Sequence, residues 1–328
     1  MRLTKYSFIC FFIFLAANMI TVYAQSDVVK LINAYGTFDN WTVREIEESG
    51  IIGGRTKYLY EFFGSPEDTI RTGKEPLVTP EDYLWRTNNV LAVVAGVVKT
   101  NNTVFPEKRG NGYCARIETH IEEVNALGIV NMAVTCQGVM MVGVLPEPIR
   151  DTKNPMEKVF YGVPFNGRPK ALMFDYKADV GHNVVRGTGF SKPKVTGIKD
   201  YPEVVFILQK RWEDDKGRIH ALRVGTAIRR FTFNAPNWIN DYEMKVEYGD
   251  ITSSPDYKPY MGLKNGVDQV AYYAANSKGR NVEVIEEGWA EPDETPNHMI
   301  ILFLSSCGEA FCGGIGNTLW IDDVEIVM

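Results

Sequence analysis

The sequence predicts an all-β protein built as a β-sandwich or jelly roll, and three observations support this prediction. Runs of β-branched and apolar residues recur at close spacing, with Gly, Pro, Asn and Asp between them. Segments that suit a helix are few and short, and they lack convincing caps. No Pro-rich or Gly/Ser-rich linker interrupts the chain, so we expect one elaborated domain.

The chain begins with a segment typical of a signal peptide. Arg2 and Lys5 precede an apolar run over residues 8–20, and residues 22–24 have the small-residue pattern of a cleavage site. We therefore predict that residues 1–24 are removed and that the protein is exported, to the periplasm, the cell surface or the medium. No transmembrane segment is expected, because no later stretch approaches the about 20 apolar residues that spanning requires.

The predicted strands follow one another along the mature chain. Two apolar runs flank Gln137 and Gly138 and suggest a hairpin, and a second, longer hairpin turns at residues 214–217. A continuous apolar run near the end predicts a strand buried on both faces. The predicted strands are residues 131–136, 139–145, 170–178, 203–212, 219–228, 242–248 and 299–304. Short helical turns are expected at residues 43–48, 121–127 and 269–277.

The last strand carries two adjacent carboxylates that disturb its alternation. Leu319 and Ile321 share one parity, whereas Val324 and Ile326 have the opposite parity. One face of the strand stays apolar only if an extra residue is absorbed between these pairs. We therefore predict a β-bulge at residues 322–323.

Composition and charge exclude one class of partner. Apolar residues make up 45% of the chain and charged residues 23%, with 35 basic and 41 acidic side chains and a net charge of -6. No basic run resembles a nucleic-acid footprint. Nucleic acid is therefore not expected as a partner.

Four cysteines follow the predicted signal peptide: Cys114, Cys136, Cys307 and Cys312. Export favours an oxidised pair, and the three connectivities of four cysteines stay open from sequence. We predict a disulfide between Cys307 and Cys312, which lie in one glycine-rich loop. Zinc is not expected, because neither pair has the two-residue spacing of a zinc knuckle and the histidines are scattered.

Several blocks of the sequence resemble one known family. They include Trp-Arg-Thr-Asn-Asn at residues 85–89, Cys-Ala-Arg-Ile-Glu-Thr at 114–119, the run over residues 162–177 and the closing Leu-Trp-Ile-Asp-Asp-Val at 319–324. In this order they resemble the "putative carbohydrate metabolism domain" family of exported bacterial proteins associated with glycan use. Asn317 stands where that family usually has Ser, and its loop at residues 307–313 does not normally carry cysteines.

The resemblance implies a jelly-roll β-sandwich similar to carbohydrate-binding modules. We expect it over residues 40–328, after a lead-in of residues 25–39. It also implies a function connected with glycans, although it does not imply a particular reaction, because a fold does not settle function.

Tryptophans in loops are the first candidates for a glycan site, because sugars stack on aromatic rings while polar groups bind their hydroxyls. Trp238 and Trp289 lie in loop-like contexts, and Trp85 has Asn88 close by in sequence. We predict that these four residues bind a polysaccharide or oligosaccharide. The alternative for each tryptophan is packing in the core. Three further tryptophans are assigned to the core or to structural roles: Trp41, Trp212 and Trp320.

A glycoside hydrolase or lyase is the main alternative to a non-catalytic glycan-binding protein. Hydrolysis needs two carboxylates about 5 to 9 Å apart, and the candidates are Glu118, Asp175, Glu203, Asp322 and Asp323, with no pair selected by the sequence. An ion pair between Asp175 and Lys177 on one strand face would also explain Asp175. A second alternative is a structural or adhesive surface protein.

The acidic pair of the bulge raises the question of a metal ion. Asp322 and Asp323 offer the hard oxygen ligands that Ca²⁺ prefers, and we consider a structural calcium site there. The alternative is that these carboxylates bind local backbone amides and shape the strand. No cofactor is required by either hypothesis.

Overall fold

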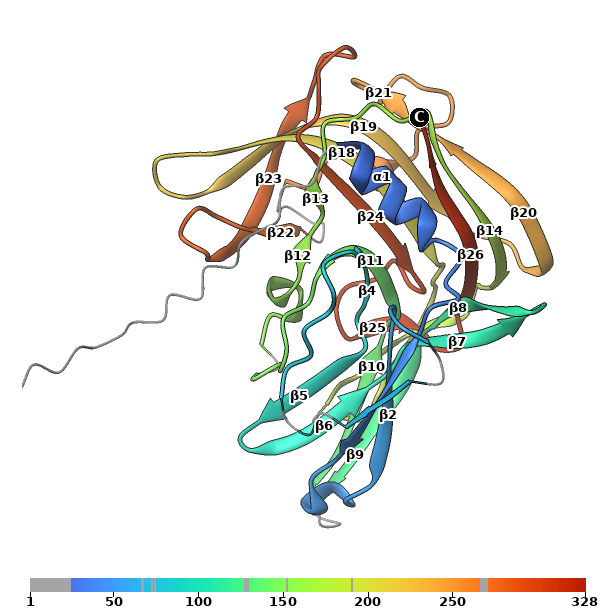
Figure 1. The fold of residues 1–328 in the computed structure, drawn as a ribbon, viewed down its shortest axis with the longest axis vertical. Helices are drawn as coiled ribbons and strands as arrows, with labels where there is room; N and C mark the ends of the chain where they lie inside the picture. Colours follow the sequence, from blue (N-terminus) through green and yellow to red (C-terminus); the bar gives the residue numbers. More distant parts are fainter. Residues whose placement is uncertain are drawn as a thin grey trace, which may run out of the picture.

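The computed structural model describes residues 25–65, 68–71, 73, 75–126, 130–151, 153–189, 191–265 and 271–328. These residues form many strands, one α-helix and three 3-10 helices (Figure 1). The predicted all-β sandwich is therefore confirmed, whereas the strand order does not by itself establish a jelly roll. The predicted signal peptide lies outside the described residues. In the part of the chain that is described, no helix is long and apolar enough to cross a membrane.

Two sheets form the sandwich. The large sheet has ten strands, with the order β12-β11-β24-β18-β19-β23-β22 and with β4, β13 and β21 attached to it. The small sheet has five strands in the order β20-β14-β26-β8-β7. The strands of the large sheet are β4 (Trp85–Thr87), β11 (Val139–Val144), β12 (Phe160–Tyr161), β13 (Val163–Pro164), β18 (Glu203–Glu213), β19 (Ile219–Arg230), β21 (Glu247–Tyr248), β22 (Tyr272–Ala275), β23 (Asn281–Trp289) and β24 (His298–Leu304). Those of the small sheet are β7 (Val104–Arg109), β8 (Gly112–Glu118), β14 (Ala171–Asp179), β20 (Ala235–Lys245) and β26 (Thr318–Val327).

The main hydrophobic core lies between the two sheets. Met299, Ile301 and Phe303 of β24 belong to this core, whereas Ile300 and Leu302 belong to a second core on the opposite face of the large sheet. Alternate side chains of a strand point to opposite faces, so β24 is buried on both sides, as its continuous apolar run predicts. The long hairpin of β18 and β19 is also confirmed.

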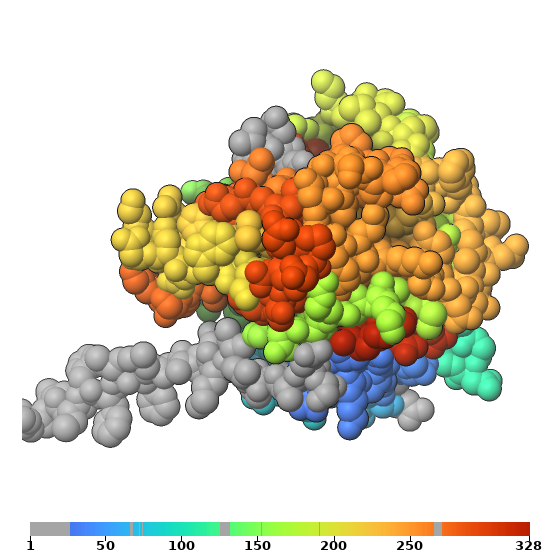
Figure 2. Space-filling model, turned by 90° about the horizontal axis from the view of Figure 1, so that it is seen from above, coloured from blue at the N-terminus to red at the C-terminus, as the bar shows by residue number. Residues whose placement is uncertain are grey.

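An N-terminal helix, α1 (Gln25–Ala34), closes one end of the sandwich. Its residues Val28 and Ile32 are buried in the main core. The Asn33 side chain donates to the Ile326 carbonyl (3.3 Å) and accepts from the Ile326 amide (2.9 Å). Figure 2 shows this N-terminal segment, in blue, against the red C-terminal strand. The lead-in of residues 25–39 is thus an integral part of the fold, and its helix was not predicted.

The bulge in β26 is where the sequence places it. Between the pairs Met173–Glu325 and Asp175–Asp322, β26 contains one more residue than β14. Asp323 has a positive φ of 48°, a backbone conformation in which Asp is enriched. Leu319 and Val324 consequently both face the main core despite their opposite parity.

Smaller sheets form the lower part of the molecule in Figure 1, around β2, β5, β6 and β9. Ile46, Leu59, Leu91 and Val98 make a separate small core there. The remaining elements are β1 (Thr42–Glu47), β2 (Thr56–Glu61), β3 (Thr69–Arg71), β5 (Val90–Val94), β6 (Val97–Asn101), β9 (His120–Ala126), β10 (Val130–Cys136), β15 (Asn183–Arg186), β16 (Thr188–Gly189), β17 (Lys194–Lys199), β25 (Cys312–Gly314) and the 3-10 helices η1 (Gly50–Ile52), η2 (Pro155–Lys158) and η3 (Pro259–Met261). The predicted helical turns at 43–48 and 121–127 are wrong, because strands β1 and β9 lie there. In the third predicted turn, residues 269–270 lie outside the described residues and Tyr272–Ala275 form a strand.

The predicted hairpin around Gln137 is wrong as well. Strand β10 pairs with β9, whereas β11 pairs with β24 of the large sheet. Gly138 passes through a tight space in this crossing, since a Cβ atom there would lie 2.6 Å from Ile117 Cγ2 and 2.8 Å from the Thr103 carbonyl oxygen. The chain therefore leaves one sheet and enters another at this glycine.

Candidate functional site

One face of the small sheet points away from the main core and carries aromatic and charged side chains. Lys177, Trp320, Arg116 and Phe105 are direct cross-strand neighbours on β14, β26, β8 and β7. Trp238 of β20 adds a second indole beside this row. We call these five residues the tryptophan face. Each is half-buried, so each keeps part of its side chain exposed to solvent.

Lys177 lies against two indole rings. Its Nζ is 4.6 Å from the ring centroid of Trp320 and 5.4 Å from that of Trp238, within the range of cation–π attraction. The predicted ion pair between Lys177 and Asp175 is wrong, because Asp175 pairs with Arg109. Cationic side chains and aromatic rings thus alternate along the row of Lys177, Trp320, Arg116 and Phe105.

Arg109, at the end of β7, connects the tryptophan face to a group of carboxylates. Its Nη1 donates to Asp322 Oδ2 (2.8 Å) and Asp323 Oδ2 (3.2 Å), while its Nη2 donates to Asp175 Oδ2. The guanidinium also stacks on Trp238, with Cζ 3.9 Å from the ring centroid. Charge-assisted bonds of this kind are strong and fix the orientation of each carboxylate.

Burial controls the proton affinity of this group. Asp175 and Asp322 are direct cross-strand partners, an arrangement of like charges that is unfavourable without a cation. Burial raises the pKa of Asp322 to about 6, and the hydrogen bond from Arg109 opposes this rise only in part. Burial and the charge of Asp175 also raise the pKa of Asp323.

A pocket of about 300 Å³ lies beside Arg109. We call it the Arg109 pocket. Asp323 exposes 57% of its side chain there, so its carboxylate can accept hydrogen bonds from a ligand. The pocket is lined by Thr37, Asp39, Arg109, Gly110, Gly112, Tyr113, Asp322 and Asp323.

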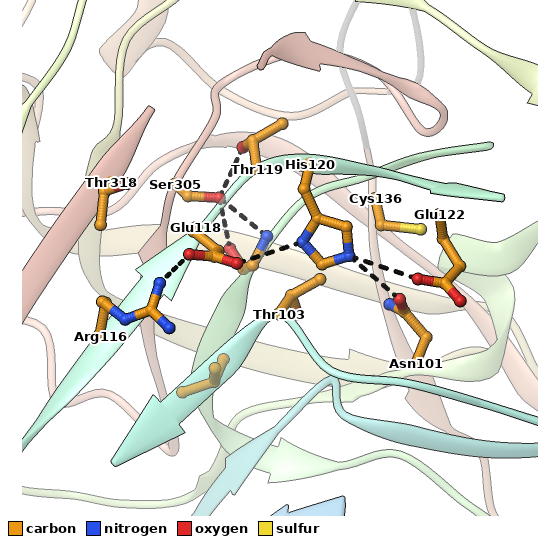
Figure 3. A network of polar contacts seen from close by, with 12 residues as sticks. Asn101, Thr103, Arg116, Glu118, Thr119, His120, Glu122, Cys136, Ser305 and Thr318 are labelled. Atoms are coloured by element: carbon orange, nitrogen blue, oxygen red, sulfur yellow. Dashed lines mark hydrogen bonds and ion pairs between the residues drawn. The ribbon is translucent and has the colours of Figure 1, made fainter. Parts of the chain in front are cut away.

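A chain of polar side chains leads from the tryptophan face to a second pocket (Figure 3). Arg116 pairs with Glu118, whose Oε1 lies 3.5 Å from His120 Nδ1, and His120 Nε2 lies 3.8 Å from Glu122 Oε2. The pocket measures about 290 Å³, and we call it the His120 pocket. It is lined by Lys57, Thr100, Asn101, Asn102, Phe105, Glu118, His120 and Glu122.

Burial lowers the pKa of His120, and the positive charge of Arg116 lowers it further, whereas Glu122 opposes both effects. The imidazole is therefore favoured in its neutral form. Its Nε2 lies 3.3 Å from Asn101 Oδ1, a distance suited to donation by Nε2–H. The His120 pocket thus offers neutral and anionic acceptors beside the ring of Phe105.

Trp85 and Asn88 do not form a surface site. Trp85 is 1% exposed and donates from Nε1 to the Ile32 carbonyl at 3.2 Å. Asn88 donates to the Gln137 carbonyl (2.7 Å) and accepts from the Val139 amide (2.8 Å). The ring of Trp85 is thus packed in the core, as the alternative for each tryptophan expects, and the half-buried Asn88 side chain connects β11 to the segment before β5.

The other two predicted residues are half-buried and lie on different sheets. Trp238 belongs to β20 and to the tryptophan face, whereas Trp289 belongs to β23 of the large sheet and lies near Arg223. Figure 1 shows these strands on opposite sides of the sandwich. The assignment of Trp212 to the core is wrong, because it is 44% exposed and stacks on His220.

The five candidate carboxylates for hydrolysis fall into three separate places. Asp175 belongs to the Arg109 group and Glu118 to the His120 pocket. Glu203 is buried and paired with Arg230 at 2.7 Å, and burial raises its pKa. Of the five candidates, Asp175, Asp322 and Asp323 are therefore brought together at Arg109, whereas Glu118 and Glu203 lie apart from them.

Asp322 and Asp323 give the calcium prediction no support. Arg109 occupies the position between their carboxylates. Over the described ranges, no group of three or more His, Cys, Asp or Glu is arranged to hold a metal ion. Asp322 Oδ1 instead accepts from the Asp323 amide at 2.9 Å, as the strand-shaping alternative expects.

The predicted disulfide is absent from the structure, in which Cys307 and Cys312 are free thiols. The Cys307 thiol donates to Asp200 Oδ1 at 3.3 Å, and burial raises its pKa to about 12. Asp200 also accepts from the Gly314 amide at 2.7 Å. A buried carboxylate thus holds this glycine-rich loop without a covalent link.

Sequence reasoning missed Arg109, Lys177 and Trp320. One signal was available for Trp320, because its parity is opposite to that of the core residues Leu319 and Ile321. For Arg109 the sequence shows only a turn, Arg-Gly-Asn-Gly at residues 109–112. Its partners lie 66 and 213 residues away, and no local pattern indicates them.

Two solved structures are similar to this chain at low identity. The first is described as a "putative glycoside hydrolase" from Bacteroides thetaiotaomicron VPI-5482, with 16% identity, a TM-score of 0.43, and coverage of 84% of this chain and 75% of that chain. The second, with the same description, is from Bacteroides vulgatus ATCC 8482, with 15% identity, a TM-score of 0.39, and coverage of 89% and 96%. Similarities of this size carry no argument about function.

The sequence profile of one family covers most of the chain. No curated protein matches the chain. The profile described as "Putative carbohydrate metabolism domain" matches residues 72–327, which include the small sheet, the Arg109 group and the lining of the His120 pocket except Lys57. On this match, the chain belongs to the putative carbohydrate metabolism domain family.

Proposed function

We propose that this protein binds a polysaccharide or oligosaccharide on the tryptophan face and in the adjacent Arg109 pocket, without cleaving it. The observation that carries the proposal is the arrangement of Trp238 and Trp320 on the face of one sheet, next to carboxylates that Arg109 holds in place. Membership in a carbohydrate-related family is consistent with it. The predicted signal peptide adds that binding takes place after export.

The chemistry of the tryptophan face suits sugars. An indole covers the C–H face of a sugar ring, and partly exposed indoles provide that area at small entropic cost. Trp320 is held in place, because its Nε1 donates to Glu107 Oε1 at 2.8 Å. Trp238 is held by the guanidinium of Arg109. Rings that are fixed before binding lose little freedom when a ligand arrives.

The Arg109 pocket supplies the polar part of such a site. Sugar hydroxyls donate well to carboxylates, and Asp323 presents an exposed carboxylate next to the phenol ring of Tyr113. Asp39 accepts from the Tyr113 amide at 2.8 Å and lines the same pocket. Carboxylates oriented in advance give directional recognition of hydroxyl groups.

The test is binding to a panel of plant and host polysaccharides, measured by affinity electrophoresis and isothermal titration. We expect Trp238→Ala to weaken binding by roughly tenfold or more, which corresponds to about 1.4 kcal/mol. Trp212→Ala is the matched control, because Trp212 is exposed on β18, outside the tryptophan face. Equal affinity of wild type and Trp238→Ala for every polysaccharide that binds would contradict the proposed site.

Hydrolysis is the second candidate function, and one observation favours it. Burial raises the pKa of Asp322 to about 6, and Asp322 lies opposite Asp175, so one carboxyl of increased proton affinity adjoins another carboxyl group. Glycoside hydrolysis uses such a pair. The test is the release of reducing ends from the polysaccharides that bind. Loss of that release in Asp322→Asn, with binding retained, would establish catalysis in place of binding alone.

A further inference from the structure

The Arg109 pocket and the His120 pocket lie at the two ends of one hairpin, formed by β7 and β8. Gly112 lines the first pocket and Glu118 lines the second. Both residues belong to β8, and six residue steps separate them, which in a strand span about 20 Å. The pockets are similar in volume, at about 300 and 290 Å³.

The surface between the two pockets is continuous in its chemistry. Glu107 Oε2 accepts from Arg116 Nε at 3.1 Å, and Glu107 Oε1 accepts from the indole of Trp320. The side chains of Arg116 and Glu107 are 27% and 39% exposed. An aromatic ring flanked by partly exposed hydrogen-bonding groups therefore lies along the path from one pocket to the other.

The His120 pocket repeats the composition of the Arg109 pocket. Phe105 provides a ring there, as Tyr113 does in the Arg109 pocket, and Glu118 and Glu122 provide carboxylates. Each carboxylate is oriented by a cation, because Arg116 holds Glu118 and Lys99 holds Glu122. Two pockets of the same chemistry, joined by an aromatic path, suit a ligand with repeated units.

We propose that the two pockets are subsites for one extended glycan chain, which crosses the tryptophan face between them. This inference rests on the proposed glycan binding and adds the class of ligand, an internal stretch of a polysaccharide in place of a single terminal sugar. Once a glycan chain occupies one pocket, its binding in the second pocket is an intramolecular step. Its affinity therefore exceeds that of a fragment confined to one pocket.

The experiment compares two lengths of the same glycan by isothermal titration. The probes are the disaccharide and the octasaccharide of xylan, β-mannan, β-glucan and hyaluronan. We expect wild type to bind one octasaccharide more tightly than its disaccharide, by roughly tenfold or more. His120→Ala should remove most of this advantage and leave the disaccharide affinity unchanged, because His120 lines only the His120 pocket and does not belong to the tryptophan face.

Two further variants keep the test independent of folding defects. Glu118→Gln preserves the shape of the side chain and should reduce the octasaccharide advantage in the same direction. Trp212→Ala should leave both affinities as in wild type. Thermal unfolding of each variant identifies any loss that results from a damaged fold.

The outcomes separate this inference from the proposed function. Equal affinity for both lengths, or an equal loss for both lengths in His120→Ala and Glu118→Gln, overturns the two-subsite arrangement while glycan binding stands. Absence of binding to all probes and to the polysaccharide panel overturns both proposals. An octasaccharide advantage that both variants abolish supports the extended ligand.

Discussion

Two arginines of this molecule have similar partners and different surroundings. Arg109 and Arg223 both lie near a tryptophan ring, at 3.9 Å from Trp238 and 5.5 Å from Trp289, and both pair with carboxylates. The Arg223 side chain is 0% exposed, whereas that of Arg109 is 20% exposed. An arginine, a tryptophan and a carboxylate thus lie together twice, once buried in the large sheet and once beside the Arg109 pocket.

The two arginines differ in whether their partner carboxylates keep oxygen atoms exposed as hydrogen-bond acceptors. Glu286 accepts from Arg223, from Gln209 Nε2 at 2.6 Å and from the Lys264 amide at 2.6 Å, and it is fully buried. Asp323, a partner of Arg109, exposes 57% of its side chain. A charge network that fills every acceptor stabilises the fold, whereas one that leaves an acceptor exposed can also bind a ligand.

The largest expected effect is on the buried pair. Glu286→Gln leaves the charge of Arg223 uncompensated inside the protein, and we expect a loss of about 3–5 kcal/mol in the free energy of unfolding. Urea denaturation measures it. Glu291→Gln, at an exposed position, is the control and should change stability little. If Glu286→Gln lost as little free energy of unfolding as Glu291→Gln, other groups would have to compensate the charge of Arg223.

A pH titration tests the half-buried group around Arg109. The pKa of Asp322 is raised from 3.8 to about 6, so the folded state keeps a proton that the unfolded state releases. The free energy of unfolding should therefore fall as the pH rises from 3.8 to about 6, by about 2 kcal/mol. Asp322→Asn removes this titration, and its stability should be flatter across the same window. Identical pH profiles for the two proteins would disprove the assignment.

The two tryptophans near these arginines should separate binding from packing. Trp238→Ala is expected to weaken glycan binding by roughly tenfold, or about 1.4 kcal/mol. Trp289→Ala should leave the affinity within about twofold of wild type, since Trp289 lies near the filled network of Arg223. Isothermal titration of both variants against the same polysaccharide decides this. A larger loss for Trp289→Ala would move the site to the large sheet.

The fold could be predicted from the sequence wherever the pattern is local. The bulge at residues 322–323, the burial of β24 on both faces and the β18–β19 hairpin follow from alternation and turn residues within a single stretch. Trp85 could not be assigned in this way, because it is buried against distant segments, including α1, whose Ile32 carbonyl is 53 residues away and accepts from the indole. The predicted hairpin at Gln137 failed for the same reason, since the pairing partner of β11 is β24, far along the chain.

The candidate site was predictable only in part. Trp238, Asp322 and Asp323 were identified by residue type, but their common partner Arg109 was not. Arg109 acts through long-range contacts, and a single arginine in a turn has no signature of its own. The site is therefore a product of strand order, which the sequence pattern does not specify.

The smallest expected effect concerns a third arginine, at the surface. Arg71 pairs with Glu45 at 2.7 Å, but its side chain is 83% exposed. Exposed pairs contribute little, so Arg71→Gln should lower the free energy of unfolding by at most about 0.5 kcal/mol. Glu286→Gln and Arg71→Gln thus test a fully buried and an exposed ion pair in the same protein. A loss comparable to that of Glu286→Gln would show that burial does not determine the contribution of these pairs.

The place of β26 has a consequence for the order in which the protein acquires its structure. Strand β26 lies in the middle of the small sheet, between β14 and β8, yet it follows every other described strand in the sequence. During synthesis, β14 and β8 therefore each keep one unpaired edge until residues 318–327 have been added to the chain. Closure of the sandwich joins segments up to 293 residues apart, and contacts of such separation form slowly. The small sheet should accordingly stay incomplete, and the main core beneath it accessible to chaperones, until β26 has been synthesised.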